Sequence, residues 1–296
     1  MTARVSAMAD HEALNPLTRQ VVASFEAAPD PRLRQVMQSL VMHLHAFAED
    51  VQLTMSEWEA AIGFLTQTGQ KCDDKRQEFI LLSDTLGLSM LVDAINHKTT
   101  GGVTETTVLG PFYVPPLAET PSGSDIAGDT EGTPLHVVAQ VTSPDGAPVA
   151  DAWVDVWQAD DDGYYDVQKP GQTENLRARF RTDAEGRVSF WSIVPTSYPI
   201  PTDGPVGRML GAVGRHPYRP AHVHFMIGKD GYETLVTHLF MAGDAYLHSD
   251  AVFGVKDELI VTPLDVAEGA TEAGDRVGPH KRLDYVFGLR PSAPAA

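Results

Sequence analysis

The chain contains a single cysteine, Cys72, so no disulfide bond can form within it. It also lacks any uninterrupted apolar run of about 18 residues, the length that a membrane-spanning helix requires. Residues 1–16 contain no apolar core of the kind found in signal peptides. These absences predict that the chain does not insert into a membrane, and we expect a cytoplasmic location.

Basic residues are also scarce. The 22 Lys and Arg residues are outnumbered by 40 Asp and Glu residues, and the formal net charge is -18. Binding to a phosphate backbone needs clustered Lys and Arg, so this composition argues against a nucleic-acid partner. Hydrophobic residues make up 43% and charged residues 21% of the chain, which favours a globular protein over a disordered or fibrous one.

The first hundred residues carry helical patterns. Asn15 followed by Pro16 is typical of a helix start, because Asn caps backbone amides and proline fits the first turn. Pro31 opens a second helix in the same way. Apolar residues recur in this helix at three- and four-residue spacing, and they are Leu33, Val36, Met37, Leu40, Val41 and Leu44. A stripe of this width is suited to an interface with a partner.

Two further helices are predicted before residue 100. Ser56 and Glu59 have the spacing of a capping box at the start of the third helix. Residues 74–96 are predicted to form a fourth amphipathic helix, although Gly87 in its middle costs about 1 kcal/mol relative to alanine. The N-terminal part is therefore expected to be helical throughout.

Beyond residue 102 the periodicity changes to that of strands. Alternating apolar residues and turn residues predict three hairpins, 135–141 with 153–157, 179–181 with 188–191, and 223–227 with 235–241. Short strands at this spacing are typical of a β-sandwich or barrel, and residues 195–220 are predicted to be a long loop. The fold class is therefore predicted as α+β, with a helical N-terminal domain of residues 1–104 and a β-sandwich domain of residues 105–296.

His222 and His224 are the first candidate metal ligands. Side chains two residues apart on a strand point to the same face, so both imidazoles can approach one ion. The chain offers no second cysteine and no H-E-x-x-H motif for a zinc site, so oxygen ligands are needed. Carboxylates and tyrosines are both open alternatives at this point. Arg219, which Pro220 biases towards an extended conformation, either stabilises negative charge beside the histidines or lies on the surface of the sandwich.

Four motifs follow in an order that resembles the intradiol catechol dioxygenases. They are W-x-A with G-Y-Y within residues 157–165, V-P-x-x-Y at 194–198, G-R-H-x-x-R-P-A-H-V-H-F at 214–225 and A-G-D-x-Y at 242–246. The resemblance extends from the N-terminal helices almost to the C-terminus. Residues 78–84, 109–113 and 250–257 are most similar to the hydroxyquinol 1,2-dioxygenase branch of this family.

The resemblance implies that Tyr165, Tyr198, His222 and His224 hold iron(III). Phenolate oxygens are hard anionic donors that suit ferric iron, and a cation of that charge ionises phenols. The family pattern also implies that Tyr198 is the catalytic base and that Arg219 stabilises developing negative charge. The substrate pocket implied by the resemblance consists of Leu81, Asp84, Val108, Leu109, Gly110, Pro111, Phe112, Ile200, Pro201, Arg219 and Val252.

The implied reaction is cleavage of hydroxyquinol (1,2,4-trihydroxybenzene) by O2 to 3-hydroxy-cis,cis-muconate or maleylacetate, a step of aromatic degradation. Asp84 is expected to accept a hydrogen bond from the third hydroxyl. Catechol or a substituted catechol, giving cis,cis-muconate, is the alternative substrate. His238 is a departure, because catechol-cleaving relatives commonly carry Gln there. The family also implies a homodimer joined by the N-terminal helices, with a lipid chain in the interface.

Two hypotheses of other classes remain. One is a non-catalytic β-sandwich that binds a partner or carbohydrate, and the other is a zinc hydrolase that uses His222 and His224. Both predict a colourless protein. An intradiol enzyme is instead expected to be coloured by charge transfer from tyrosinate to iron.

Overall fold

The computed structural model describes residues 14–73, 76–98, 101–116, 118–169, 171, 174–267 and 278–292. The chain divides into two compact units, Met1–Thr66 and Gln67–Ala296. The sequence suggests a different boundary, after residue 104, between a helical and a catalytic domain. That boundary stays a prediction. Among the described helices, none is both long enough and apolar enough to cross a membrane.

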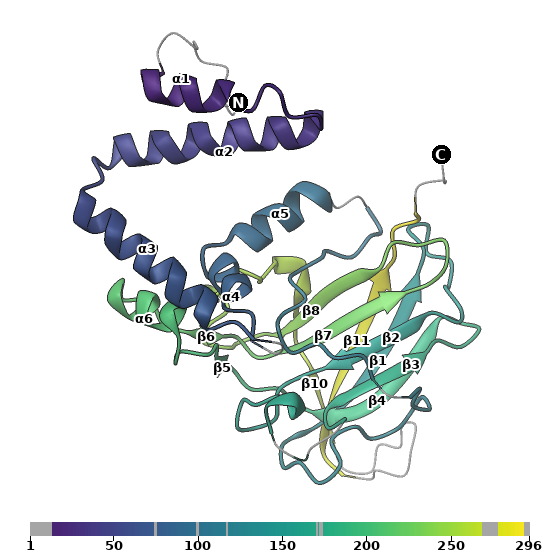
Figure 1. The fold of residues 1–296 in the computed structure, drawn as a ribbon. Helices are drawn as coiled ribbons and strands as arrows, with labels where there is room; N and C mark the ends of the chain where they lie inside the picture. Colours follow the sequence, from purple (N-terminus) through teal and green to yellow (C-terminus); the bar gives the residue numbers. More distant parts are fainter. Residues whose placement is uncertain are drawn as a thin grey trace. The chain divides into compact units, whose positions relative to one another are not determined.

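The first unit consists of helices α1 (Pro16–Ala23), α2 (Pro31–Asp50) and most of α3 (Met55–Gln70). The first two helices begin at a proline, as the sequence predicts. Asn15 and Asp30 cap them by accepting hydrogen bonds from backbone N–H groups of the first turn. Helix α1 packs against α2 (Figure 1), where Thr18 Oγ1 lies 2.9 Å from His45 Nδ1.

The capping box of α3 differs from the predicted one. Thr54 and Glu57 form it, rather than Ser56 and Glu59. The Glu57 carboxylate accepts from the Thr54 N–H at 2.9 Å, and Thr54 Oγ1 accepts from the Glu57 N–H at 3.3 Å. Both pairs have the same spacing in the sequence, so the motif alone could not distinguish them.

Residues 74–96 contain two helices instead of the single predicted helix. Helices α4 (Glu78–Thr85) and α5 (Leu88–Asn96) meet at Gly87, whose φ of +74° is the left-handed conformation that ends helices. The Gly87 N–H donates to the Asp84 carbonyl at 2.9 Å and closes the last turn of α4. The apolar spacing continues across the break, so periodicity did not reveal it. The predicted start at Asp74 lies outside the described residues.

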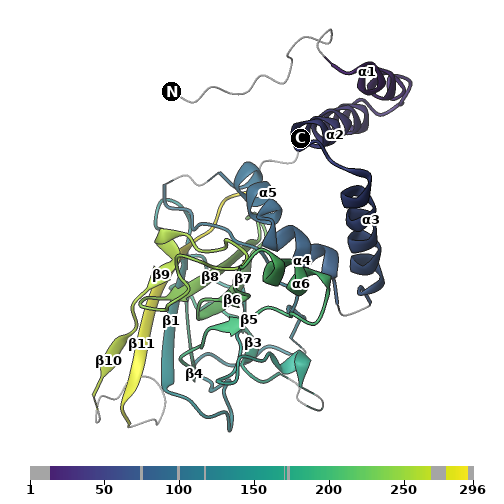
Figure 2. The same cartoon turned by 90° about the vertical axis from the view of Figure 1, so that its left-hand side faces the viewer.

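The second unit is built on a β-sandwich, as predicted (Figure 1 and Figure 2). One sheet has the order β10 (Leu264–Val266), β11 (His280–Gly288), β1 (Pro134–Thr142) and β4 (Arg187–Ile193). The other has the order β3 (Arg177–Arg181), β2 (Trp153–Trp157), β7 (His222–Gly228), β8 (Leu235–Met241) and β9 (Ile260–Val261). The core lies between the sheets, where Val137 and Phe190 of the first belong to the same buried cluster as Phe225 and Leu239 of the second.

Only one of the three predicted hairpins pairs as expected. Strands β7 and β8 are antiparallel neighbours, with His224 opposite His238. Strands β1 and β2 lie in different sheets, and so do β3 and β4. Alternating apolar residues identify a strand with one buried face, but both sheets of a sandwich bury one face against the same core. The pattern therefore located the strands without identifying their partners.

Residues 195–220 are more ordered than the predicted loop. They contain the short strands β5 (Tyr198–Pro199) and β6 (Tyr218–Arg219) and helix α6 (Pro205–Ala212). The two strands pair with each other, which places Tyr198 opposite Arg219. Helix α6 contacts α4, and the buried Glu78 carboxylate of α4 accepts from the Val206 N–H at 3.1 Å.

Candidate functional site

Four polar side chains from three segments converge in the second unit. Tyr165 follows β2, Tyr198 opens β5, and His222 and His224 lie on β7. The Tyr165 hydroxyl is 2.8 Å from that of Tyr198 and 2.9 Å from His224 Nε2. His222 Nε2 is 3.1 Å from His224 Nε2 and 3.4 Å from the Tyr198 hydroxyl. The residues that the sequence singled out as ligands are thus brought together.

Local packing explains why these side chains meet. Trp157 of β2 lies opposite His224 of β7 in the sheet register and stacks on its ring. Gly163 has a φ of +84°, and a Cβ there would lie 2.8 Å from the Tyr198 Cβ. A glycine at this position therefore lets the segment that leads to Tyr165 pass close to Tyr198.

The four groups are neutral when no cation is bound. Burial raises the pKa of Tyr165 well above its ordinary value and also raises that of Tyr198. Burial, followed by the charge of Arg219, lowers the pKa of His222 to about 3, and burial lowers that of His224 well below its ordinary range. Two phenol oxygens and two uncharged imidazole rings that face one another are a set of donor atoms suited to a positive ion.

The histidine tautomer fits such an ion. His222 Nδ1 lies 2.6 Å from the Pro220 carbonyl oxygen, which can only accept, so Nδ1 carries the proton. The Nε2 lone pair of His222 consequently faces the other three groups. This is the arrangement by which a backbone carbonyl usually orients a metal-binding imidazole. Two nitrogen and two oxygen donors at these separations could hold a metal ion.

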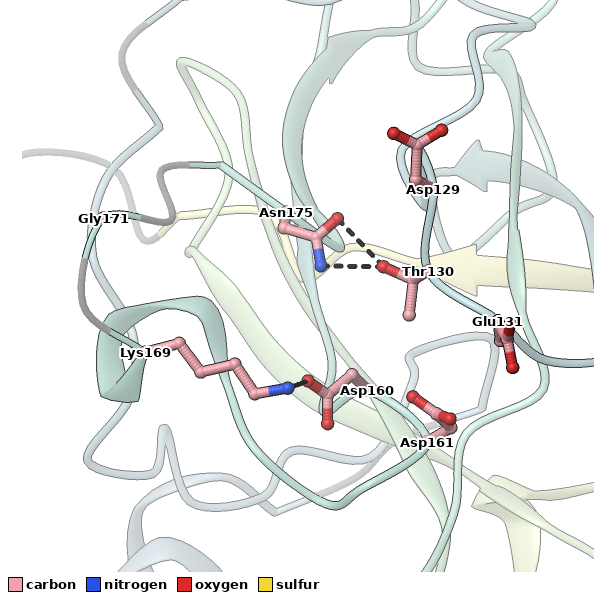
Figure 3. Close-up of a pocket in the computed structure, with 8 residues that line it drawn as sticks. All are labelled: Asp129, Thr130, Glu131, Asp160, Asp161, Lys169, Gly171 and Asn175. Atoms are coloured by element: carbon pink, nitrogen blue, oxygen red, sulfur yellow. Dashed lines mark hydrogen bonds and ion pairs between the residues drawn. The ribbon is translucent and has the colours of Figure 1, made fainter.

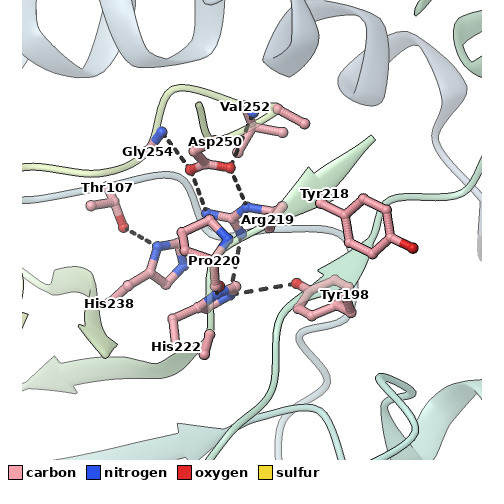
Figure 4. Close-up of polar contacts among 12 residues, drawn as sticks. Thr107, Tyr198, Tyr218, Arg219, Pro220, His222, His238, Asp250, Val252 and Gly254 are labelled. Atoms are coloured by element: carbon pink, nitrogen blue, oxygen red, sulfur yellow. Dashed lines mark hydrogen bonds and ion pairs between the residues drawn. The ribbon is translucent and has the colours of Figure 1, made fainter. Parts of the chain in front are cut away.

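Arg219 lies beside this cluster and forms an ion pair with Asp250 (Figure 4). The sequence did not single out Asp250 as a site residue. Both side chains are buried, with Nε 3.2 Å and Nη2 3.3 Å from the two carboxylate oxygens. The Arg219 Nη1 lies 3.3 Å from His222 Nε2. Burial raises the pKa of Asp250 and is the largest single effect, but the charge and hydrogen bonds of Arg219, with smaller contributions from His222 and the Val252 N–H, together bring the pKa below its ordinary value.

His238 of β8 is a third histidine next to the cluster. Its Nδ1 is 2.9 Å from Thr107 Oγ1, and its ring meets that of His224 edge to face at a centroid distance of 4.1 Å. Its buried Nε2 has no hydrogen-bond partner among the described residues. His222, His224 and His238 each offer a ligand atom within 4.8 Å of the other two.

The predicted pocket residues fall into two groups. Leu81, Ile200 and Val252 belong to one buried apolar cluster, against which Val108 packs, and Asp84 is buried on α4. A Cβ on Gly110 would lie 3.3 Å from His224 Cε1, and Phe112 stacks on Tyr165 at a centroid distance of 4.7 Å. By contrast, Leu109 and Pro111 are exposed and Pro201 is half-buried.

A surface hollow lies apart from this site, and none of the four converging residues lines it (Figure 3). Its lining residues are Asp129, Thr130, Glu131, Asp160, Asp161, Lys169, Gly171 and Asn175. Asp160 is ion-paired with Lys169, and its Oδ1 accepts from the Asp162 N–H at 3.1 Å and the Tyr164 N–H at 2.9 Å. Asp160 therefore shapes the turn that delivers Tyr165 to the site.

Comparison with known proteins gives the family. Residues 108–290 match the family model described as Dioxygenase, and residues 30–104 match the one described as Catechol dioxygenase N terminus. The chain belongs to the intradiol dioxygenase family. The resemblance seen in the sequence and the α+β fold class are both confirmed. As a member of this family, the chain is an enzyme that uses a metal cofactor and acts on an aromatic substrate with O2.

Individual relatives agree with this assignment. The intradiol dioxygenase is 50% identical to hydroxyquinol 1,2-dioxygenase of Nocardioides simplex, over 93% of this chain and 95% of that protein. The crystal structure of hydroxyquinol 1,2-dioxygenase from Pseudomonas putida DLL-E4 is 51% identical, with a TM-score of 0.88, covering 93% and 98% of the two chains. Catechol 1,2-dioxygenase from Pseudomonas arvilla C-1 is 31% identical, with a TM-score of 0.78, covering 94% and 92%.

Proposed function

We propose that this intradiol dioxygenase cleaves hydroxyquinol with O2 to 3-hydroxy-cis,cis-muconate, the tautomer of maleylacetate. The observation that carries the substrate choice is Asp84, a buried carboxyl group in the last turn of α4. Leu81 on the same helix belongs to the buried apolar cluster with Ile200 and Val252. The carboxylate has one polar partner in Ser89, and its remaining acceptor capacity beside these apolar residues suits the third hydroxyl of hydroxyquinol, which catechol lacks.

The metal is proposed to be iron(III), held by Tyr165, Tyr198, His222 and His224. Two tyrosine oxygens favour the ferric over the ferrous ion, because hard anionic donors stabilise the higher charge. Ferric iron bound there supplies Lewis acidity, which lowers the pKa of the diol hydroxyls and makes the ring reactive towards O2. His238 is not assigned as a ligand, because the family motifs that supply the other four residues do not include it; its Nδ1 is bonded to Thr107 and its Nε2 has no hydrogen-bond partner among the described residues.

Tyr198 is proposed as the catalytic base. Its hydroxyl contacts both Tyr165 and His222, so a diol entering the cluster has this oxygen within reach of its proton. Arg219 is buried beside His222 and keeps its positive charge, because the Asp250 carboxylate offsets the cost of burying it. Its guanidinium is proposed to stabilise the negative charge that develops on the substrate.

Asp84 is proposed to select the substrate by its charge state. Burial raises the pKa of this carboxyl group, while a hydrogen bond from Ser89 and the charge of Arg219 act in the opposite direction. When ionised, the carboxylate accepts a hydrogen bond from the third hydroxyl. A site built around such a bond rejects the analogue that leaves its polar group unpaired.

One set of measurements tests the proposed function. Purified protein is analysed for metal content and visible absorbance, and kcat/KM is measured for hydroxyquinol and for catechol. We expect iron, a tyrosinate-to-iron absorption band and a preference for hydroxyquinol. A colourless zinc protein would contradict the iron assignment and favour the hydrolase alternative. Preference for catechol would contradict the substrate while leaving the family chemistry intact.

The first unit is proposed to form a homodimer. Helix α2 has no buried residue, and Leu33, Leu40 and Leu44 are each more than half exposed, at 53%, 53% and 57%. Exposed large apolar side chains on one stripe of a helix are typical of an association surface. We propose that two copies pair through this stripe, with a lipid chain bound in the apolar interface. A cytoplasmic location completes the proposal and is tested by cell fractionation.

A further inference from the structure

The buried Asp250 carboxylate accepts four hydrogen bonds from three residues. Its Oδ1 accepts from Arg219 Nε and from the Val252 N–H, both at 3.2 Å. Its Oδ2 accepts from Arg219 Nη2 at 3.3 Å and from the Gly254 N–H at 2.9 Å (Figure 4). Both oxygens are therefore occupied, and only 4% of the residue is exposed to solvent that could replace these bonds.

Arg219 is fixed at both ends by this arrangement. Its backbone lies in the short β5–β6 ribbon opposite Tyr198. Its guanidinium uses Nε and Nη2 for Asp250, which leaves Nη1 directed at His222 Nε2, 3.3 Å away. A flexible four-bond side chain is thus held in one orientation, with its free edge towards the metal-binding cluster.

The same carboxylate folds the segment Asp250–Gly254. A side chain at Gly254 would crowd this ion pair, because a Cβ there would lie 2.9 Å from Arg219 Nη2 and 3.2 Å from Asp250 Oδ2. The preceding residue, Phe253, has a φ of +58°, a strained conformation for a side chain of this size. Bonds from one carboxylate to two backbone amides stabilise this tight segment.

The outer side of the segment is held by a different residue. Arg215 donates to the Ala251 carbonyl at 2.9 Å and to the Thr85 carbonyl at the end of α4 at 2.6 Å. Asp250 fixes the inner side, where Val252 packs in the apolar cluster with Leu81. The orientation of Val252 relative to a bound ring thus depends on the same carboxylate as the orientation of Arg219.

We propose that Asp250 is a positioning residue that sets both the Arg219 guanidinium and the Val252 wall of the ring pocket. This inference rests on the proposed function. Asp250 does not touch the substrate and acts only through these two groups. Displacement of a catalytic group by about 1 Å costs on the order of 10²-fold in rate, so loss of Asp250 is expected to lower kcat by this amount.

The test compares Asp250→Asn with Asp155→Asn in the iron-loaded enzyme. Asp155 is also buried and pairs with Arg179, which lies over Trp153 rather than beside the metal cluster. Asn keeps the size of the side chain but turns one acceptor into a donor that faces Arg219 or the Gly254 N–H. Iron content, the visible band, urea unfolding, kcat, KM and anaerobic hydroxyquinol binding are measured for each variant.

We expect Asp250→Asn to retain iron and the visible band, to lose about 10²-fold in kcat, and to favour hydroxyquinol over catechol less strongly. Asp155→Asn is expected to lose stability with kcat unchanged. A kcat within twofold of wild type for a folded, iron-loaded Asp250→Asn would overturn the proposal. A wild-type enzyme without iron or ring cleavage would instead overturn the proposed function, so the two failures are distinguishable.

A second variant covers the case in which Asp250→Asn does not fold. Gly254→Ala retains the carboxylate and its charge but places a methyl group against Arg219 Nη2. We expect kcat to fall at least about tenfold with iron retained, because the guanidinium must move. In addition, Arg219→Lys removes the two parallel bonds from the guanidinium to Asp250. If Gly254→Ala acts through Arg219, adding it to Arg219→Lys is expected to lower kcat little further. Independent, additive losses would show that the segment does not act through Arg219.

Discussion

Trp157 lies flat against the imidazole of His224, with ring centroids 4.6 Å apart and an angle of 15° between the planes. The two residues are opposite one another on β2 and β7, so the stack is fixed by the register of the sheet. The His224 Nδ1 has no hydrogen-bond partner among the described residues. On its Nδ1 side this imidazole is therefore held by packing, whereas the Nδ1 side of His222 is held by its bond to the Pro220 carbonyl.

We predict that Trp157→Leu weakens metal retention. Loss of the stacked ring allows the His224 imidazole to rotate, and loss of support for a metal-binding side chain typically costs about 10- to 100-fold in metal affinity. The measurement is iron content after dialysis against a chelator. Trp153→Leu, at the other end of β2, is the matched control and is expected to retain iron. Equal retention by both variants would contradict a role for the stack.

The proposed metal ligands are expected to differ in the effect of their removal. Tyr165→Phe and His224→Ala should lose most of the bound iron and nearly all turnover, because each removes a donor atom. Tyr198→Phe should keep part of the iron and lose the base. Tyr164→Phe is the control, since the Tyr164 side chain is 52% exposed. Full iron occupancy and normal turnover in Tyr165→Phe would refute the ligand assignment.

Asp84→Asn is predicted to narrow the preference for hydroxyquinol over catechol. An amide retains the size of the carboxyl group but lacks its charge, so the bond to the third hydroxyl is weakened. We expect the ratio of the two kcat/KM values to fall by at least about tenfold, equivalent to ~1.4 kcal/mol. The control is Asp203→Asn, where the side chain is 63% exposed. A parallel fall for both substrates would assign Asp84 a structural role.

His136 is predicted to make stability sensitive to acid. Burial, followed by the charge of Arg282, lowers its pKa in the folded protein below the value of 6.5 expected when unfolded. The unfolded chain then binds the proton more tightly than the folded protein does. The contribution of neutral His136 to the free energy of unfolding is therefore fully present above pH 6.5 and is lost as the pH falls towards the pKa of the folded state.

The test is urea unfolding at pH 7.5 and at about pH 5.5 for wild type and His136→Gln. His136 can change the free energy of unfolding by at most ~1.4 kcal/mol per pH unit. We expect the pH dependence in His136→Gln to be smaller than that of wild type by the contribution of this group. An unaltered slope in His136→Gln would show that His136 does not titrate on unfolding.

The helical stripe of α2 gives a prediction about assembly. Leu40→Glu places a charge in the proposed interface, and we expect it to convert a dimer into a monomer in light scattering at micromolar concentration. Gln35→Glu, also exposed on α2, is the control. A stable wild-type monomer would refute the dimer. Extraction of the protein with organic solvent, followed by mass spectrometry, tests the lipid separately.

The four converging residues could be predicted from the sequence for two different reasons. Alternation along a strand places His222 and His224 on one face, and the family motifs supplied Tyr165 and Tyr198. Asp250 was missed as a site residue because its partner Arg219 is distant in the sequence. Nothing in the local pattern indicates that a carboxylate after β8 folds back onto β6.

The errors in the predicted fold have a common physical origin. Gly87 interrupts a helix whose apolar spacing is continuous, and one backbone conformation was sufficient to divide it into α4 and α5. The separation of β1 from β2 and of β3 from β4 depends on which sheet each strand joins. That choice is made by tertiary packing, which a pattern of alternating residues does not encode.

The parallel pairing of β1 with β11 has a consequence for synthesis of the protein. Strand β1 lies between β4 and β11 in its sheet, and Leu283 and Phe287 of β11 complete the core on which the β7 strand packs. The ribosome releases β11 long after β1 and β7, so the core remains open during most of translation. We therefore expect the proposed metal site to be shielded from water only when β11 has emerged, and metal loading to be a late, largely post-translational event.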